Sequence, residues 1–258
     1  MAILPEARLP GVRAAPPLRV CQPGDSLLSF ANRLFPVLLV IDNFVEDPGL
    51  LIQQASLLAP FPEVEGNQYP GTRRLLDPDK DEVYSYVDLA CRGLAPLLRQ
   101  VWGVDKFSVT EAGFSMVTRR PDRIRPIQRV PHYDSIDPRN FAVLHYLSKP
   151  PKGGTAFYRH RRTGFVMLDE GRYDTYRDAF QEDIREFGEP PLEYVNESTS
   201  AWEKIGEVEG LYNRCVVYQG CIFHSGLIPP GFNFSTDTLS GRLTGNIFLR
   251  ATAMSAPQ

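Results

Sequence analysis

The segment Gly241-Arg242-Leu243-Thr244-Gly245-Asn246-Ile247-Phe248-Leu249 alternates between polar and apolar residues. On a strand, successive side chains point to opposite faces, so the even-numbered positions from Arg242 to Phe248 share one face and Leu243, Ile247 and Leu249 share the other. If the aliphatic face packs on helices, the polar face lines the interior of the protein. A buried arginine needs an anion, and its planar fork suits a carboxylate. The alternative is an edge strand with Arg242 in water.

Short apolar segments separated by Gly and Pro precede this strand, which is typical of a β-barrel or jelly roll. With the strand itself, the predicted strands are Phe114–Thr118, Arg129–Asp134, Phe141–Leu147, Thr155–Tyr158, Gly164–Met167, Cys215–Tyr218, Ile222–His224 and Arg242–Leu249. The predicted fold class is therefore mainly β with helices (α+β), a double-stranded β-helix (jelly-roll or cupin-like) barrel with N-terminal helices packed on one sheet.

Upstream of the barrel, the chain predicts one buried strand and two helices. Pro36–Ile41 is apolar and strand-sized, and Asp47-Pro48 supplies an N-cap and an N1 proline for a helix through about Leu58. Apolar residues at helical spacing predict a second helix over Asp79–Trp102, after a loop over residues 61–79. We expect a Pro-rich N-terminal arm over residues 1–35 and a single domain over 36–258.

A helical insertion at about 161–213 is expected to interrupt that domain. It carries predicted helices at Tyr173–Phe187 and Ser198–Ile205. The aromatic residues Tyr173, Tyr176 and Phe180 either cap a pocket as a lid or form the apolar face of a surface helix.

Length, composition and charge exclude several classes of protein. The chain has 258 residues and a formal net charge of −3, which argues against a chain-wide nucleic-acid footprint. No apolar stretch approaches the roughly 20 residues of a membrane helix, and the N-terminus lacks the apolar core of a secretory signal. The four cysteines form no CxxC pair, so reduced thiols and a cytoplasmic location are expected.

Pro131-His132-Tyr133-Asp134 places an imidazole and a carboxylate at positions i and i+2. On a strand these two side chains share a face, so both can reach one metal ion. A second imidazole, that of His224, closes a short apolar run downstream. Two histidines and one carboxylate form the facial arrangement that non-haem Fe(II) prefers. The alternatives are a polar strand end at His132 and a structural histidine at position 224.

Phe141-Ala-Val-Leu-His145-Tyr146-Leu147 is apolar on both faces, as expected of a central strand. His145 and Tyr146 point in opposite directions, so only one of them can face a pocket. We expect Tyr146 inside, with its hydroxyl available to a ligand carboxylate, and His145 in a packing role.

The order of these pieces resembles the Fe(II)/2-oxoglutarate-dependent oxygenases, especially the prolyl-hydroxylase-like branch. The matching pieces are His132-Tyr-Asp134, Tyr146-Leu-Ser-Lys149, Gly153-Gly154-Thr-Ala-Phe157, His224 and Arg242, with Val37–Phe44 as the opening strand. The resemblance covers roughly residues 37–250. The runs Gly153–Gly164 and Tyr212–Gly226 also resemble a bacterial family of uncharacterised function.

The resemblance implies His132, Asp134 and His224 as ligands of Fe(II). It further implies that Arg242 binds the distal carboxylate of 2-oxoglutarate as a cosubstrate, with Tyr146 as a hydrogen-bond partner and Thr244 as a possible third contact. The implied activity is the hydroxylation of a small-molecule or peptide substrate, with release of succinate and CO2. The alternatives are a cupin-type metal enzyme that does not use 2-oxoglutarate and a non-catalytic ligand-binding barrel.

Two basic clusters bear on the substrate. Five arginines between Arg119 and Arg129 precede His132, and Arg159-His160-Arg161-Arg162 follows the Gly-Gly strand. They are either solvated loops or a rim that attracts an anionic substrate. Aromatic interleaving is slight, which again argues against nucleic acid, and the sequence leaves the oligomeric state open.

Overall fold

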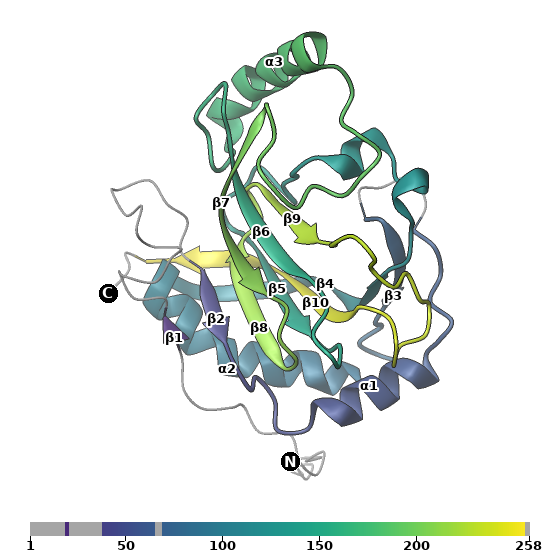
Figure 1. The fold of residues 1–258 in the computed structure, drawn as a ribbon. Helices are drawn as coiled ribbons and strands as arrows, with labels where there is room; N and C mark the ends of the chain where they lie inside the picture. Colours follow the sequence, from purple (N-terminus) through teal and green to yellow (C-terminus); the bar gives the residue numbers. More distant parts are fainter. Residues whose placement is uncertain (1–18, 21–37, 65–68, 256–258) are drawn as a thin grey trace, which may run out of the picture.

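The computed structural model describes residues 19–20, 38–64 and 69–255 of the chain. Seven strands form a large antiparallel sheet in the order β1-β2-β8-β5-β10-β4-β3, and three form a small antiparallel sheet in the order β7-β6-β9 (Figure 1). The large sheet contains β1 Arg19–Val20, β2 Leu39–Ile41, β3 Gly71–Leu75, β4 Val104–Val117, β5 Asn140–Tyr146, β8 Arg214–Gln219 and β10 Leu243–Met254. The small sheet contains β6 Gly154–His160, β7 Trp202–Glu209 and β9 His224–Leu227. The predicted α+β class is confirmed.

Three α-helices accompany the sheets in the described part of the chain: α1 Pro48–Leu57, α2 Tyr84–Trp102 and α3 Glu170–Phe187. In Figure 1, α1 and α2 run along one side of the large sheet, and α3 lies at the opposite end of the molecule beside the small sheet. Two short 3-10 turns, Pro121–Arg123 and Pro126–Arg129, lie between β4 and β5. None of the described helices combines the length and apolar character that a bilayer span requires.

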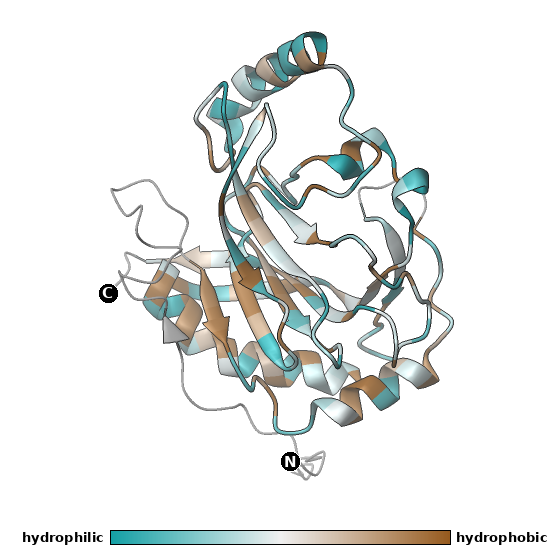
Figure 2. Ribbon diagram, in the orientation of Figure 1, coloured by the Kyte–Doolittle hydropathy of each residue, from teal (hydrophilic) through white to brown (hydrophobic). Residues whose placement is uncertain are grey.

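The main core lies between the large sheet and the first two helices. Leu94, Leu98 and Trp102 of α2 are buried there with Leu243, Ile247 and Leu249 of β10. The hydrophobic residues of these elements are visible in Figure 2. The expected packing of the aliphatic face of Leu243–Leu249 on helices is therefore confirmed, and the opposite face of β10 is turned toward the small sheet.

The helix predictions are correct in place, with shifted starts. Asp47 caps α1 by accepting a hydrogen bond from the Leu50 amide at 3.1 Å, and Pro48 occupies its first turn, as the sequence indicated. Helix α2 begins at Tyr84 instead of Asp79, because Asp81 folds back to accept hydrogen bonds from the Asp77 amide and the Arg74 guanidinium. It ends at Gly103, whose φ of 68° is the left-handed C-cap that glycine favours.

Four predictions of local structure were wrong. Residues 71–75, expected in a loop, form the edge strand β3, and Ser198–Ile205, expected as a helix, gives way to β7 from Trp202 onward. Arg129–Asp134 and Gly164–Met167 are not strands, because each makes only one isolated bridge, His132 to His224 and Met167 to Ile222. These segments take their conformation from a partner distant in sequence, which local periodicity does not reveal.

Most of the predicted N-terminal arm, residues 1–35, lies outside the described residues, as does Cys21. The other three cysteines, Cys91, Cys215 and Cys221, are free. The predicted insertion contains the helix α3, but it also contributes β7 to the small sheet, so it is not purely helical.

Asn213, in the turn before β8, connects the large sheet to the segment that enters α1. Its side chain accepts a hydrogen bond from the Val45 amide at 3.1 Å and donates one to the Val45 carbonyl at 2.7 Å. The same side-chain oxygen lies 3.0 Å from Nε2 of His145, whose Nδ1 lies 3.0 Å from the Tyr86 hydroxyl. Burial lowers the pKa of His145 to about 4, so its imidazole is neutral and fully bonded. The expected packing role of His145 is confirmed.

We predict that Asn213→Ala destabilises the protein far more than the matched change Asn43→Ala. Both asparagines have positive φ, 63° and 53°, but Asn43 is exposed. Each change loses the tolerance of asparagine for the left-handed region, so the difference between them reports the buried hydrogen bonds. That difference should be about 2–3 kcal/mol in the free energy of unfolding, measured by urea denaturation. Equal effects of the two changes would mean that the Asn213 hydrogen bonds contribute nothing.

Candidate metal centre and active-site cavity

His132, Asp134 and His224 come together on the inner side of the small sheet, and their ligand atoms all lie within 4.8 Å of one another. Nε2 of His132 lies 3.9 Å from one Asp134 carboxylate oxygen, and Nε2 of His224 lies 3.7 Å from the other. Two donors that each bind one ion at about 2.1 Å can be at most about 4.2 Å apart, so these pairs fit a shared ion. The two imidazoles and the carboxylate could therefore hold one metal ion.

The backbone holds the three residues in place. The amides and carbonyls of His132 and His224 exchange two hydrogen bonds, of 2.9 and 2.8 Å, and the Asp134 amide donates to the Gly220 carbonyl at 2.7 Å. A Cβ on Gly220 would lie only 3.1 Å from that of Asp134, so the glycine permits this close approach. Two chain segments almost ninety residues apart are thereby fixed against each other, as a metal centre requires.

Hydrogen bonding and burial act on the three residues of the cluster. Nδ1 of His224 donates to the Ile222 carbonyl at 2.8 Å, so Nε2 is the nitrogen that faces Asp134, at 3.7 Å. Burial, and secondly the neighbouring His224, hold the pKa of His132 well below its ordinary value. Burial raises the pKa of the Asp134 carboxyl; the charges of His224 and Arg73 oppose this rise and that of Glu111 adds to it. Arg73 and Glu111 are therefore within electrostatic reach of the cluster.

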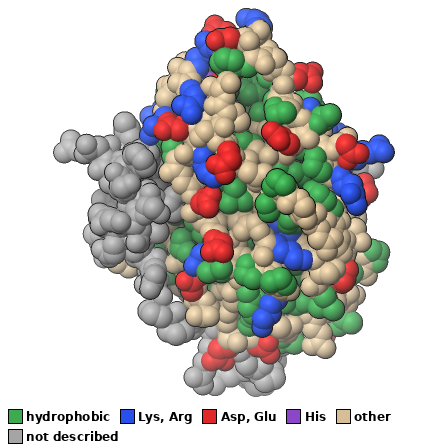
Figure 3. Space-filling model, viewed as in Figure 1, with side chains coloured by type: hydrophobic (Ala, Val, Ile, Leu, Met, Phe, Trp, Pro, Cys, Tyr) green, Lys and Arg blue, Asp and Glu red, His purple; other side chains and the backbone are tan. Residues whose placement is uncertain are grey.

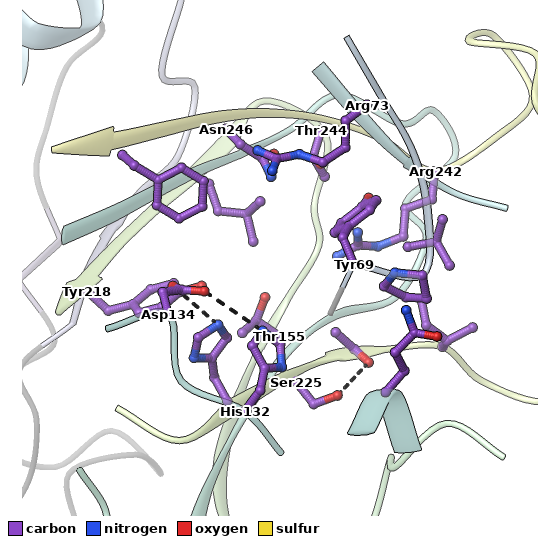
Figure 4. A pocket seen from close by; sticks show the side chains of 18 of the residues that line it. Tyr69, Arg73, His132, Asp134, Thr155, Tyr218, Ser225, Arg242, Thr244 and Asn246 are labelled. Carbon is purple, nitrogen blue, oxygen red and sulfur yellow. Dashed lines mark hydrogen bonds and ion pairs between the residues drawn. The ribbon is translucent and has the colours of Figure 1, made fainter. Parts of the chain in front are cut away.

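The cluster opens into a cavity of about 720 Å³ between the two sheets, which also contains Arg242 and Thr244 (Figure 4). These two side chains come from β10 and lie on the face opposite its aliphatic residues, as the alternation predicted. Further polar groups line the same cavity, among them Tyr69, Thr155 and Ser225. The cavity therefore has a cluster of metal-binding type in one part of its wall and a cationic group in another.

Arg242 is 4% exposed and has no carboxylate partner among the described residues. One of its terminal nitrogens donates to the Gly154 carbonyl at 3.0 Å, its guanidinium carbon lies 5.6 Å from the centre of the Tyr146 ring, and its buried Nε has no hydrogen-bond partner in the described structure. A buried guanidinium without a counter-ion is costly, so this end of the cavity is prepared for an anion.

The expected position of the Tyr146 hydroxyl differs from the one observed. Tyr146 does point inward, but its ring lies under the Arg242 guanidinium and its hydroxyl lies 2.7 Å from the Thr155 hydroxyl. The member of this pair that lines the cavity is Thr155, in the Gly-Gly-Thr run. Arg242 and Thr155 therefore lie between Tyr146 and the cavity. Tyr146 packs behind both residues and does not itself line the cavity.

The cavity residues that sequence reasoning missed include Arg73, Glu111 and Tyr218. Arg73 lies on the edge strand β3, in a stretch rich in Gly and Pro that indicated a loop. Glu111 belongs to a part of β4 that was not predicted as a strand. Only Tyr218, at the end of the predicted strand Cys215–Tyr218, carried a signal, because it shares a face with Val216 and alternates with the core residue Val217.

Helix α3 does not cover the cavity, so the lid interpretation of Tyr173–Phe187 was wrong. No residue of α3 lines the cavity. Instead Tyr176 is buried against Phe223 and Tyr133, at ring-centre distances of 4.9 and 6.2 Å. Phe223 precedes His224, and Tyr133 lies between His132 and Asp134, so their rings point away from the cavity. The helix therefore packs behind the residues of the metal cluster.

The basic clusters are mostly occupied by partners within the chain. Arg159 pairs with Glu203, and Arg162 pairs with Asp183 and Glu186 of α3, where Asp183 also lies 2.6 Å from Nε2 of the buried His160. Arg119 and Arg129 donate to backbone carbonyls. On the face shown in Figure 3, acidic and basic side chains are interspersed. These arginines form ion pairs and hydrogen bonds with nearby loops and with α3, so they do not form a continuous rim that attracts anions.

Fold and site together define an α+β protein with a candidate mononuclear metal centre in a cavity between two antiparallel sheets. The sequence model of a family of unknown function, DUF6445, matches residues 32–249, and the chain belongs to this family. No protein of curated function matches the sequence.

Several solved structures are similar to this chain at low sequence identity. One is HygX from Streptomyces hygroscopicus with iron bound, at 16% identity, a TM-score of 0.48 and coverage of 83% of this chain and 82% of that one. HygX with nickel, 2-oxoglutarate and hygromycin B bound is 14% identical, with a TM-score of 0.45 and coverage of 84% of this chain and 83% of that one. A prolyl-4-hydroxylase from Pseudomonas putida is 14% identical, with a TM-score of 0.43 and coverage of 84% of this chain and 93% of that one.

We predict that Tyr176→Ala weakens metal binding although Tyr176 is outside the cavity. The loss of its ring removes the support behind Tyr133 and Phe223, and outer residues that orient metal ligands are worth roughly tenfold or more in affinity. Ni(II) titration calorimetry measures the effect. Phe187→Ala, at the exposed end of the same helix, is the matched control and should bind Ni(II) like the parent. Parental affinity in Tyr176→Ala would show that α3 has no influence on the ligands.

Proposed function

We propose that this protein is an Fe(II)- and 2-oxoglutarate-dependent oxygenase that oxidises, by hydroxylation, a small-molecule or peptide substrate. The observation that carries the proposal is the pairing, within one cavity, of the His132–Asp134–His224 cluster with a buried Arg242 that has no counter-ion among the described residues. A metal site alone fits many activities. A metal site that shares its cavity with an unneutralised guanidinium favours a dicarboxylate with one end at each group.

The donor set supports iron. Two imidazoles and one carboxylate that face a cavity are the donor set that non-haem Fe(II) prefers. His132 and His224 would present Nε2, and Asp134 would supply the negative charge that keeps the cation in place. The hydrogen bond from His224 Nδ1 to the Ile222 carbonyl would hold that ring in its ligating orientation.

The groups around Arg242 support 2-oxoglutarate as the cosubstrate. Its guanidinium would receive the distal carboxylate in a charge-assisted, bidentate contact, and the side chains of Thr244 and Thr155 line the same cavity. The Tyr146 ring beneath the guanidinium holds it in position. The keto-acid end would then point toward the metal cluster.

Iron and 2-oxoglutarate together would supply an O2-dependent oxidation with release of succinate and CO2. The residues of the chain would bind, orient and exclude water. The cavity lies between the two sheets, and Leu144 and Phe248 add apolar surface to its wall. We further propose that the two facing sheets form the double-stranded β-helix of this superfamily, within a single domain over residues 36–258.

We predict that each change of a proposed ligand, His132→Ala, Asp134→Asn or His224→Ala, nearly abolishes stoichiometric Fe(II) binding while the protein stays folded. Each change removes one donor of three, and water cannot replace a charged or imidazole ligand without a large loss of affinity. Anaerobic titration calorimetry measures binding, and circular dichroism reports folding. Asp137→Asn is the control, because it removes a nearby carboxylate that pairs only with Arg139 and Arg250 in the described structure. Parent-like iron binding in two of the three ligand variants would refute the assignment.

We predict that Arg242→Ala keeps the iron but weakens 2-oxoglutarate strongly. A charge-assisted hydrogen bond is worth about 1.5–3 kcal/mol, which corresponds to a loss of roughly tenfold to more than a hundredfold. Tyr146→Phe removes one neutral hydrogen bond, to Thr155, and should cost only about 0.5–1.5 kcal/mol. The order of the two effects is the test, measured by 2-oxoglutarate titration of the anaerobic Fe(II) protein. Unchanged 2-oxoglutarate binding in Arg242→Ala would favour a cupin-type metal enzyme that does not use this cosubstrate.

A further inference from the structure

A second pair of charges lines the cavity in addition to the metal cluster and Arg242. Arg73 of β3 and Glu111 of β4 are joined by a contact of 2.5 Å between a terminal guanidinium nitrogen and a carboxylate oxygen. Their side chains are 14% and 36% exposed, and both line the cavity. Figure 4 shows Arg73 on the side of the cavity away from Asp134 and His132. Neither charge is used by the proposed iron and 2-oxoglutarate sites.

Arg73 is held rigidly. Its Nε donates to the Ser115 hydroxyl at 3.2 Å, and its guanidinium carbon lies 5.7 Å from the centre of the Tyr69 ring and 5.8 Å from that of Phe248. A guanidinium fixed between two rings and a hydroxyl loses little further freedom when a ligand binds, which is the behaviour of a recognition group.

Asn246 provides the third polar group of this wall. It lies on β10 between Thr244 and Phe248, on the face turned to the cavity, and Figure 4 shows it next to Arg73 and Thr244. Its buried side-chain oxygen has no hydrogen-bond partner in the described structure. A buried acceptor without a partner is costly, and a donor group on a ligand would satisfy it.

The ion pair between Arg73 and Glu111 restricts the net charge of a ligand that can bind to this part of the cavity wall. A purely anionic ligand that takes Arg73 would leave Glu111 without its partner, and a purely cationic ligand that takes Glu111 would leave Arg73 without one. Each case separates a partly buried ion pair, which is strongly unfavourable. A ligand that carries both charges close together can replace the internal pair by two external pairs, so that no charge remains uncompensated. Its ammonium also supplies the donor that Asn246 lacks.

We propose that Arg73, Glu111 and Asn246 recognise the zwitterionic head of a free α-amino acid. Its carboxylate binds Arg73, and its ammonium binds Glu111 and Asn246. The short separation of the two charges in this group matches the direct contact between the two protein side chains. The assignment rests on the proposed function, because the substrate side chain would then extend past Phe248 and Leu144 toward the metal cluster. It narrows the substrate from small molecules and peptides in general to amino acids.

The first experiment compares ligands that differ only in charge. The protein, loaded with Ni(II) and 2-oxoglutarate, is titrated with each of the twenty standard L-amino acids, and binding is measured by thermal shift and calorimetry. For each one that binds, its α-amide and its N-acetyl derivative are then titrated. We expect at least one free amino acid to bind, and both derivatives to bind at least tenfold more weakly. The proposal is overturned if no free amino acid binds, or if either derivative binds as well as the parent compound.

The second experiment assigns each charge to its partner. In Arg73→Gln the free amino acid should bind no better than its α-amide. In Glu111→Gln the free amino acid should bind no better than its N-acetyl derivative. A purely structural ion pair would weaken all ligands alike, and that result would overturn the assignment. Arg74→Gln is the matched control, because Arg74 is adjacent on β3 and pairs with Asp81 away from the cavity. It should keep the parent's preference for the free amino acid.

A separate readout distinguishes failure of this inference from failure of the proposed function. Ni(II) and 2-oxoglutarate binding are measured in the same samples before the amino acids are added. If both bind in the parent, in Arg73→Gln and in Glu111→Gln, but amino acids do not bind the parent, only the amino-acid assignment is wrong. If 2-oxoglutarate does not bind the parent, the proposed function fails first.

Discussion

The packing of β10 against α2 is the constraint on which the rest of the structure depends. Leu243, Ile247 and Leu249 are each at most 1% exposed, and the period of two along a strand then fixes every other side chain of β10 on the opposite face. A slip of one residue would bury Arg242 among aliphatic side chains and expose the core residues to the cavity. The burial of three aliphatic side chains therefore determines that Arg242, Thr244 and Asn246 face the small sheet. The cavity chemistry is a consequence of core packing.

The cavity between the sheets separates groups of opposite character. The metal cluster is rich in lone pairs, with two imidazoles and a carboxylate, whereas the Arg242 end is cationic and lined by hydroxyls. Water that fills this space cannot neutralise both ends as well as an ion and a dicarboxylate can. Arg73 and Glu111, in contrast, already neutralise each other. This difference is why we propose bound cofactors at the first two groups and, at the third, a ligand that exchanges with an existing ion pair.

The sequence predicted those features that depend on local patterns and not those that depend on distant partners. The alternation of Arg242–Phe248, the cap of α1 and the inward direction of Tyr146 follow from spacing within a few residues, and the structure has them. His132, Asp134 and His224 were expected to share a site, and the structure brings them together, although residues 129–134 are held by a single bridge and by loops. β7 was mistaken for a helix because it gains its regular conformation only by pairing with β6. Arg73 was missed for the same reason, since its strand is recognisable only from its pairing with β4.

The position of α3 explains how an insertion distant from the cavity can still matter for it. Tyr133 and Phe223 alternate with residues of the metal cluster along the chain, so their rings point outward where the ligands point inward. The ring of Tyr176 packs against both Tyr133 and Phe223. The ring of Trp202, on β7, also packs on Phe223, at a distance of 4.8 Å between ring centres. The ion pairs from Arg162 to Asp183 and Glu186 tie the helix to the end of β6. Because Tyr133 and Phe223 are direct chain neighbours of the proposed ligands, fixing the outer side chains also restrains the inner ones. The insertion thus packs behind the proposed ligands, outside the cavity.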